Sequence, residues 1–261
     1  MTPDSRRKTQ DAGRTTPYNA DLHIHTLLSP CGEIEMIPPL IVEAAKVAGL
    51  DVIAIADHNS CENAAAVMRA AEGSGIRVLP GMEVQSVEGI HLLCLFDEIE
   101  QAEALQEAVY GSLISLPGGA YRYSEEQFVV DWEGEFVKYC EKRIALPTSM
   151  DIDEVFERVA KIGGIMIPSH IDRQGTGIID ILGMIPETPD INGLEISRNI
   201  TPDEARVRFP SVGNRPIFQN SDAHWLSAIG ERHTILHMAH RNVSEIKLAC
   251  RGVGGRRVEN A

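Results

Sequence analysis

The stretch ADLHIHTLLSP, residues 20–30, decides the fold and indicates the chemistry of this chain. A short apolar run leads here into Asp21, His23 and His25. Histidines two positions apart on a β-strand point to the same face. The pattern therefore predicts a buried strand that brings two imidazoles to one spot, with a carboxylate beside them.

Strand-like and helix-like segments alternate after this stretch. Strands are predicted at 52–57, 76–84, 91–96, 165–170, 193–197, 216–224 and 233–238. Helices are predicted at 38–49, 63–75, 98–109, 150–164, 201–209 and 242–252. This alternation is typical of an α/β protein with a largely parallel sheet, either open or closed into a barrel.

The domain organisation follows from where the alternation starts, breaks and stops. We expect a flexible lead over residues 1–19, one barrel domain over 20–250 and a flexible tail over 251–261. Stretch 110–148 breaks the alternation, and FVVDWEGEFVKY (128–139) predicts a hairpin around Trp132–Gly134. This segment is interpreted as a small hairpin and helical insertion on the barrel.

Composition limits the classes of partner and compartment. The net charge is −14, with 38 acidic and 24 basic residues, so the chain lacks the basic surplus that grips duplex nucleic acid. No duplex partner is expected, whereas a small anion in a metal-lined pocket is compatible. Five scattered cysteines without a CxxC pair predict reduced thiols in the cytoplasm. No apolar run is long enough to span a membrane.

Metal-binding residue types recur at the predicted strand ends. In α/β barrels, catalytic groups lie at the carboxyl ends of the strands, so these side chains are expected to meet at one rim. Imidazoles and carboxylates gathered so closely are stabilised when a cation unites them. The residues concerned are His23, His25, Asp57, His58, Glu83, His170, Asp222 and His224.

His91 stands at the start of its strand, which a simple parallel barrel would place at the opposite end. A tight turn at Glu88–Gly89 would make a hairpin and fold His91 back beside Glu83. On this hypothesis His91 is a further candidate ligand. The segment of His233 and His237 reads as a strand, and these two histidines are interpreted as structural or surface residues, like His240.

The motifs DLHIHT, ADHNS, PGMEV, IPSH and NSDAH, in this order, resemble those of the PHP (polymerase and histidinol phosphatase) family of metal-dependent phosphoesterases. The resemblance runs from about residue 20 to about residue 240. It implies a distorted (β/α)7 TIM-like barrel with two or three divalent metal ions at its rim. The metals are expected to be manganese, zinc or iron.

The resemblance also implies which residues hold each metal. The first metal takes His23, His25, Glu83 and Asp222, the second takes His58 and His224, and the third shares Glu83 and adds His91 and His170. Where the family usually supplies an aspartate or histidine to the second metal, this chain has Cys31. Either Cys31 is that ligand, which would favour zinc or iron, or Glu33, Glu35 or water completes the site.

The expected activity is hydrolysis of a phosphomonoester or phosphodiester by a hydroxide that bridges two metals. Asp57 is expected to orient a ligand or relay a proton. Arg173 matches an arginine of the family and is assigned to substrate phosphate, and Arg198 is a second candidate for that role; each could instead pair with carboxylates of the site.

The expected substrate is a small phosphorylated metabolite, a nucleotide or a short single-stranded oligonucleotide end. Two other hypotheses stay open: an amidohydrolase-like enzyme acting on a non-phosphate bond, and a non-catalytic metal-binding regulatory module. The amidohydrolase type usually carries a metal-bridging lysine on a middle strand, and no lysine stands at a predicted strand end here. Neither the pathway nor the oligomeric state follows from the sequence.

Overall fold

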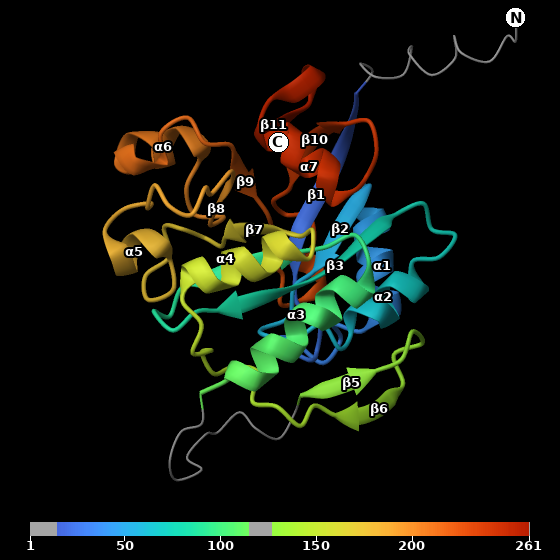
Figure 1. Ribbon diagram of the computed structural model, residues 1–261. Coiled ribbons are helices and arrows are strands. Elements are labelled where there is room, and N and C mark those ends of the chain that lie inside the picture. Colours follow the sequence, from blue (N-terminus) through green and yellow to red (C-terminus); the bar gives the residue numbers. More distant parts are fainter. Residues whose placement is uncertain (1–14, 115–126, 261) are drawn as a thin grey trace, which may run out of the picture.

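Strand β1 (Thr16–Ile24) contains the ADLHI stretch and lies within a seven-stranded sheet, in the order β11-β10-β1-β2-β3-β4-β7. The structure is a computed structural model that describes residues 15–114 and 127–260. The sheet curls into a half-barrel (Figure 1). The other strands are β2 (Val52–Ile55), β3 (Arg77–Gln85), β4 (His91–Leu95), β5 (Phe128–Val130), β6 (Phe136–Tyr139), β7 (Ile165–Pro168), β8 (Leu194–Ile196), β9 (Ile217–Gln219), β10 (Thr234–Met238) and β11 (Arg257–Asn260).

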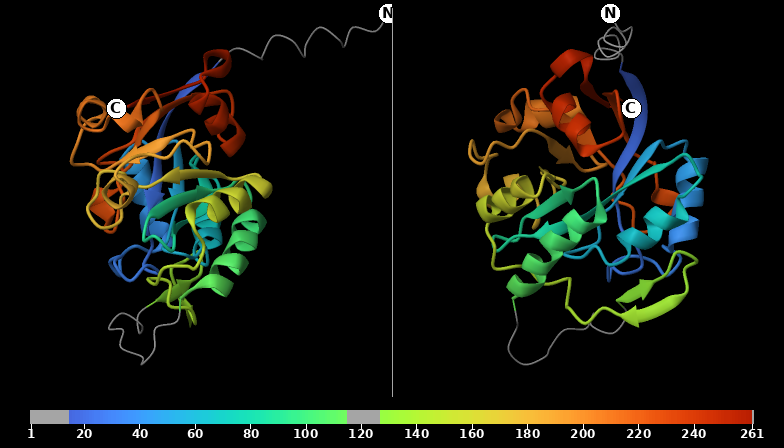
Figure 2. Two further views of the ribbon diagram at one scale, coloured as in Figure 1. Left: turned by 60° about the vertical axis from the view of Figure 1, so that its left-hand side comes forward. Right: turned by 45° about the vertical axis from the view of Figure 1, so that its right-hand side comes forward.

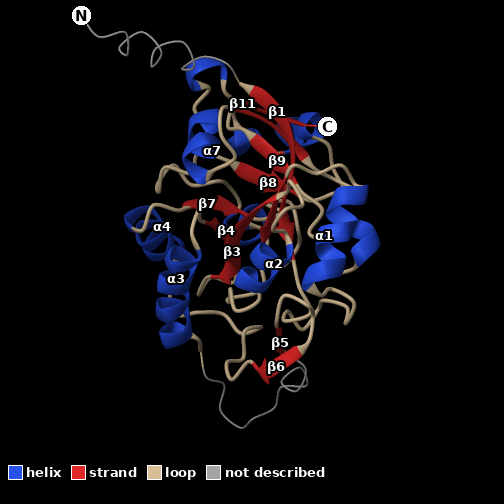
Figure 3. Cartoon of the chain, turned by 90° about the vertical axis from the view of Figure 1, so that its right-hand side faces the viewer, coloured by secondary structure: helices blue, strands red, loops and turns tan. Residues whose placement is uncertain are grey.

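Helices follow the strands along the chain and lie around the outside of the sheet (Figure 3). They are α1 (Pro38–Val47), α2 (Ala64–Ala70), α3 (Ile99–Ser112), α4 (Ile152–Lys161), α5 (Ile178–Leu182), α6 (Pro202–Arg208) and α7 (Val243–Cys250), with the short 3₁₀ turns η1 (Pro210–Val212), η2 (Leu226–Ala228) and η3 (Val253–Gly255). Among the residues that the structure describes, every helix is too short or too polar to cross a membrane.

Alternation along the strands divides the core between the two faces of the sheet. In β2, Val52 and Ala54 join an apolar cluster with Phe218 of β9, whereas Ile53 and Ile55 join the cluster that includes residues of α1 to α4. Both faces are covered, so the parallel strand β2 is apolar throughout, and the buried parts of β1 and β3 are apolar except for Asp21, His23 and Glu83. Of these three, His23 and Glu83 lie near the carboxyl ends of their strands, where the candidate site lies.

The sheet departs from a regular (β/α)7 order. Strand β4 runs antiparallel to both β3 and β7, and β10 runs antiparallel to β1. Strands β8 and β9 form a separate parallel pair, which completes the curve of the half-barrel. The antiparallel β3–β4 hairpin confirms the predicted turn: Gln85 pairs with His91, and Gly89 has a φ of 91°.

Part of each end that was predicted to be flexible forms regular structure. Strand β1 begins at Thr16, inside the predicted lead, and Arg257–Asn260 of the predicted tail form β11 against β10. Val258 packs on the core, and Glu259 accepts a hydrogen bond from His237 on β10 at 2.9 Å, which keeps the tail on the sheet. Residues 1–14 of the lead and residue 261 lie outside the described residues.

The predicted hairpin around Trp132–Gly134 is confirmed, since β5 and β6 pair antiparallel and Gly134 has a φ of 88°. The hairpin stands apart from the main sheet, below α3 in the views of Figure 2. Asn63, in the loop after β2, holds it through hydrogen bonds with the backbone of Phe128 and Val130. Residues 115–126 of the predicted insertion lie outside the described residues, so its full extent stays a prediction.

Candidate metal centre

The candidate ligands come from six distant segments and meet at one edge of the half-barrel. His23 lies in β1, Glu83 in β3 and His91 at the start of β4, and the others lie in the loops that follow β1, β2, β7 and β9. Three of these loops place a non-glycine residue in a left-handed backbone conformation: Asn59 has a φ of 49°, His170 of 29° and Asp222 of 50°. Such conformations are costly and concentrate at functional sites.

Glu83 lies at the centre of the cluster and is almost completely buried. Its Oε1 lies 3.0 Å from Nε2 of His170 and 3.1 Å from Nδ1 of His91. Its Oε2 lies 3.0 Å from Nδ1 of His58. The hairpin that was predicted from Gly89 thus brings His91 beside Glu83, as expected.

Asp222 is the second carboxylate of the cluster. Its Oδ1 lies 3.2 Å from Nε2 of His25 and 3.5 Å from Nε2 of His23. The two Nε2 atoms are themselves only 3.2 Å apart. This triad and the group of His58, Glu83 and His91 each place one donor atom per residue within 4.8 Å of the others.

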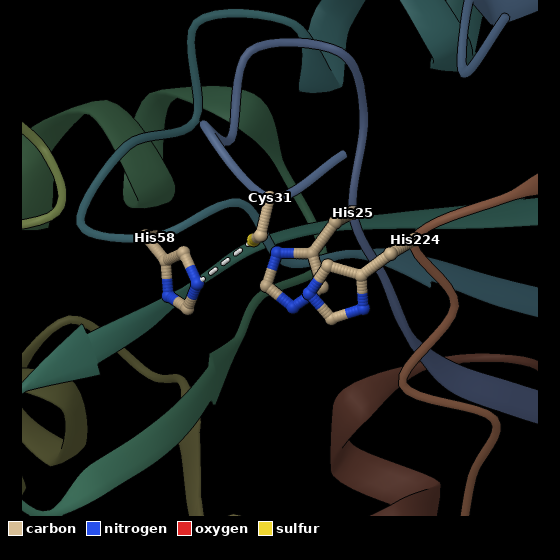
Figure 4. A group of neighbouring side chains, drawn as sticks. All are labelled: His25, Cys31, His58 and His224. Atoms are coloured by element: carbon tan, nitrogen blue, oxygen red, sulfur yellow. Dashed lines mark hydrogen bonds between the residues drawn. The ribbon is translucent and has the colours of Figure 1, made fainter. Parts of the chain in front are cut away.

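Figure 4 shows a third group, formed by His25, Cys31, His58 and His224. Sγ of Cys31 lies 3.3 Å from Nε2 of His58, and the rings of His25 and His224 stack with their centroids 4.3 Å apart. The donor set is three imidazole nitrogens and one sulfur. Such a set suits zinc, and tetrahedral coordination by nitrogen and sulfur is its usual geometry.

Unpaired polar atoms test whether the cluster fits metals better than a hydrogen-bond network. Within the described residues, buried Oδ1 of Asp222 and Nδ1 of His91 have no hydrogen-bond partner, although each lies close to other donor atoms of the cluster. Buried polar atoms without partners are costly, and lone pairs that converge on one point repel each other. A divalent cation relieves both problems, so the residues fit metal ions.

The charged side chains of the cluster strongly shift one another's pKa values. Burial raises the pKa of Glu83 and of Asp222, but the surrounding imidazoles outweigh burial and hold both pKa values well below their usual range. Burial also opposes protonation of His23, yet Glu195, Glu83 and Asp222 raise its pKa well above the ordinary value. His25 has its pKa lowered by burial and by the positive charge of His224.

Asp57 lies behind the cluster and contacts none of its donor atoms directly. Its carboxylate accepts hydrogen bonds from the backbone N–H and the hydroxyl of Thr26, at 2.7 and 2.8 Å, and from Ser29 Oγ at 2.6 Å. Ser29 Oγ in turn lies 3.1 Å from Nδ1 of His25. Because Ser29 donates to Asp57, it accepts from His25, which leaves Nε2 of His25 free to face the cluster.

A pocket of about 190 Å³ opens beside the cluster. It is lined by the candidate ligands His170, Asp222 and His224 and by the two arginines assigned to phosphate. Arg173 is 41% exposed and donates to Oδ2 of Asp222, so the alternative pairing with a site carboxylate is the one present here. Arg198 donates weakly to Glu231 at 3.4 Å and lies over the ring of Trp225.

Sequence reasoning missed Glu195, on β8, which is buried and lies against the cluster. Its carboxylate accepts from Nδ1 of His23 at 3.0 and 3.1 Å. The available signal was a single acidic residue inside the apolar run of GLEIS. By contrast, Asp21 turns away from the cluster and accepts from Ser221 and Gly230, while burial raises its pKa to about 6.

Comparisons with known proteins agree with the motifs. The PHP domain model matches residues 21–173, which is more than half of the chain. Uncharacterized protein MJ1587 of Methanocaldococcus jannaschii is 31% identical over 99 residues, 34% of this chain and 58% of that protein. Uncharacterized protein YqxK of Bacillus subtilis is 24% identical over 254 residues, 92% of this chain and 63% of that protein.

Among solved structures, the lesion-specific endonuclease Endonuclease Q of Pyrococcus furiosus is similar in fold, with a TM-score of 0.71 and 20% identity. The match covers 93% of this chain and 58% of the endonuclease. The chain thus spans about three fifths of the length of these three proteins, between 58% and 63%.

The expectation that excludes duplex nucleic acid is wrong. Endonuclease Q has also been solved in complex with a 27-mer duplex substrate that has an abasic lesion at the active site, and that structure has a TM-score of 0.65 and 18% identity to this chain. A fold of this kind therefore accommodates duplex DNA. Net charge cannot exclude such a partner, because it sums the whole surface, whereas an anion responds to the local field where it binds.

The family follows from the ordered motifs, the cluster they form and the match of the family model. All five motifs contribute a side chain to the same cluster, although they lie up to about 200 residues apart in the sequence. The donor atoms fit divalent metals. This chain belongs to the PHP domain family.

Proposed function

We propose that this chain hydrolyses a phosphoester bond with two or three divalent metal ions. The observation that carries the proposal is a pocket beside the ligand cluster in which two arginines lie with the candidate ligands His170, Asp222 and His224. Carboxylates and imidazoles suit the metals, and arginine suits the phosphoryl group. The chain therefore offers partners for both halves of the reaction in one place.

The residues divide into three neighbouring donor groups. One is His23, His25 and Asp222; the second is His25, Cys31, His58 and His224; the third is His58, Glu83 and His91, with His170 against Glu83. Divalent ions bound here lower the pKa of water and offset the negative charge that develops on phosphoryl oxygens. The division differs from the expected one because His25 and His58 each belong to two groups.

The pocket residues bind and orient the substrate. Arg173 donates to Asp222 in the structure, and a substrate phosphoryl group competes for the same guanidinium. Arg198, which also lines the pocket, contributes a second positive charge. In a chain of net charge −14, these arginines supply local attraction for an anion where the overall field repels it.

The proposed substrates are phosphate esters of metabolites, nucleotides or nucleic acids, with duplex DNA included. Endonuclease Q, which shares the fold, has been solved with a duplex substrate, and this supports testing damaged duplexes alongside small esters. The volume of the pocket, about 190 Å³, suits a phosphoryl group and part of its attached alcohol rather than a whole nucleotide. The rest of a larger substrate would lie outside the pocket.

A substrate screen tests the proposal. Protein loaded separately with manganese, zinc or iron is incubated with aryl phosphates, nucleotides, single-stranded oligonucleotides and duplexes that contain an abasic site, and released phosphate and strand cleavage are measured. Asp222→Asn removes a candidate ligand, and Asp153→Asn, on the exposed side of α4, is the matched control.

We expect activity that Asp222→Asn abolishes and Asp153→Asn leaves intact. Metal-loaded protein that cleaves none of these esters but hydrolyses an amide or a lactone would support the amidohydrolase-like alternative. Metal-loaded protein without any hydrolytic activity would support the non-catalytic module. Either result refutes phosphoester hydrolysis.

A further inference from the structure

Glu195 is a buried carboxylate between the seven-stranded sheet and the β8–β9 pair, and no step of the proposed reaction uses it directly. It lies in β8 with 1% of its surface exposed. Its partners belong to three other segments: His23 in β1, His170 after β7 and Asn220 after β9. A buried charge is costly unless it is hydrogen-bonded, so this position requires an explanation.

The contact with His23 fixes which nitrogen of that imidazole faces the cluster. Nδ1–H of His23 donates to both oxygens of Glu195, at 3.0 and 3.1 Å. Nε2 is then left without a proton in the neutral ring. This Nε2 points to the other donor atoms, 3.4 Å from Oε1 of Glu83 and 3.5 Å from Oδ1 of Asp222.

The same carboxylate also holds the backbone of a second candidate ligand. Oε2 of Glu195 accepts from the backbone N–H of His170 at 3.2 Å. His170 has a left-handed backbone, which surrounding contacts must stabilise. Its Nε2 lies 3.0 Å from Glu83, so the orientation of this backbone sets where the imidazole points.

A third contact connects Glu195 to the opposite sheet. Asn220 Nδ2 donates to Oε1 of Glu195 at 2.9 Å, and Oδ1 of Asn220 accepts from the backbone N–H of Leu22 in β1 at 2.9 Å. Ala223, beside Asp222, already bonds the backbone of His23 and His25, and this side-chain link adds to the contacts that keep Asp222 in register with β1.

We propose that Glu195 is a positioning residue for the metal centre: it sets the tautomer of His23 and the placement of His170, and so raises metal affinity in the groups that contain them. The proposal rests on the proposed function for the identity of the ligands. Carboxylates that hold the second nitrogen of a ligating histidine orient the ring and increase its basicity, and their loss weakens metal binding about 10- to 100-fold.

The test is Glu195→Gln, which keeps the shape of the side chain and removes its charge. The amide group of glutamine also turns N–H donors toward the side-chain amide of Asn220 or the backbone N–H of His170. Both of these groups are donors and need an acceptor. The dissociation constants of manganese and zinc are measured by competition with a chromogenic chelator. Glu245→Gln is the matched control, because Glu245 is also buried but pairs with Arg256 far from the cluster.

We expect Glu195→Gln to weaken metal binding about 10-fold or more, and Glu245→Gln to leave it unchanged. A cobalt titration adds a second readout, since the absorption of a cobalt–thiolate bond reports the group that contains Cys31. That absorption should persist in Glu195→Gln, because Cys31, His58 and His224 do not contact Glu195. Glu195→Asp should recover part of the lost affinity.

The proposal fails if Glu195→Gln binds manganese and zinc as tightly as the wild type, whatever its activity. It also fails if the cobalt–thiolate absorption is lost to the same extent as metal binding at the other donor groups. That result would indicate general disruption of the fold. The proposed function fails separately, when wild-type protein binds metals tightly and hydrolyses no phosphoester. Metal affinity is measured without substrate, so the two failures are distinguishable.

Discussion

The reactivity of Cys31 gives a direct test of the electrostatics of the cluster. In the metal-free protein, hydrogen bonds from His224 and His58 to the thiolate outweigh the effect of burial, and they lower the pKa of Cys31 to about 7. An unperturbed thiol has a pKa near 8.5. The thiolate is the nucleophile, so a lowered pKa makes Cys31 reactive at lower pH.

The expected magnitude follows from the thiolate fraction. At pH 7 about half of Cys31 is thiolate when the pKa is about 7, whereas an unperturbed thiol is roughly 3% thiolate. The alkylation rate at pH 7 should therefore be about half of its high-pH plateau. Thiolates of lower pKa are less nucleophilic, so the midpoint of the pH profile is the informative quantity rather than the absolute rate.

The assay is alkylation of metal-free protein by iodoacetamide from pH 5 to pH 10, with modification of each cysteine followed by mass spectrometry. Cys61 and Cys94 are internal controls, because burial raises the pKa of each thiol and shields it from the reagent. His58→Ala should move the midpoint of Cys31 upward, and zinc should protect Cys31. A midpoint at 8.5 or above in the wild type would refute the reasoning.

Three further variants separate the roles of the other site residues. Arg173→Ala should lower kcat/KM for a phosphoester roughly 10- to 100-fold, as expected for a lost charge-assisted hydrogen bond. Unchanged kinetics with metals still bound would exclude a role of Arg173 in phosphate binding. Glu83→Gln should reduce the number of bound metal ions per chain, because it removes the carboxylate shared by His58, His91 and His170. Equilibrium dialysis and elemental analysis measure this number, and full occupancy would contradict the central role of Glu83. Asp57→Asn should destabilise the metal-free protein by about 1–3 kcal/mol in urea unfolding, since its amide faces donors; a loss of kcat with unchanged stability would instead support proton relay.

The sequence predicts the cluster well where a local pattern fixes the position of a side chain. His23 and His25 follow from alternation along one strand, and His91 follows from a glycine turn that reverses the chain beside Glu83. The closure of the half-barrel is less accessible. Strand β11 has only four residues. Its pairing depends on contacts of Val258 and Glu259 with β10, which is distant in sequence, and no local sequence pattern indicates these contacts.

The limits at the site have a different physical cause. Glu195 carries no motif spacing, because its role depends on three partners that only the folded chain assembles. The division of ligands among metals also depends on rotamers, so that His25 and His58 each lie between two groups. The choice of Arg173 between Asp222 and substrate depends on whether a substrate is present, which no sequence pattern encodes.

Carboxylates and the Cys31 thiol favour protonation of two of the candidate imidazole ligands. Burial opposes charge on every member, yet the carboxylates raise the pKa of His23, and Cys31 and Glu83 raise that of His58. These protons supply the positive charge that balances Glu83 and Asp222 in the absence of metal. A metal ion must displace them, because a ligating imidazole nitrogen is unprotonated. We therefore expect metal affinity to rise with pH, because each ligating imidazole must lose its proton.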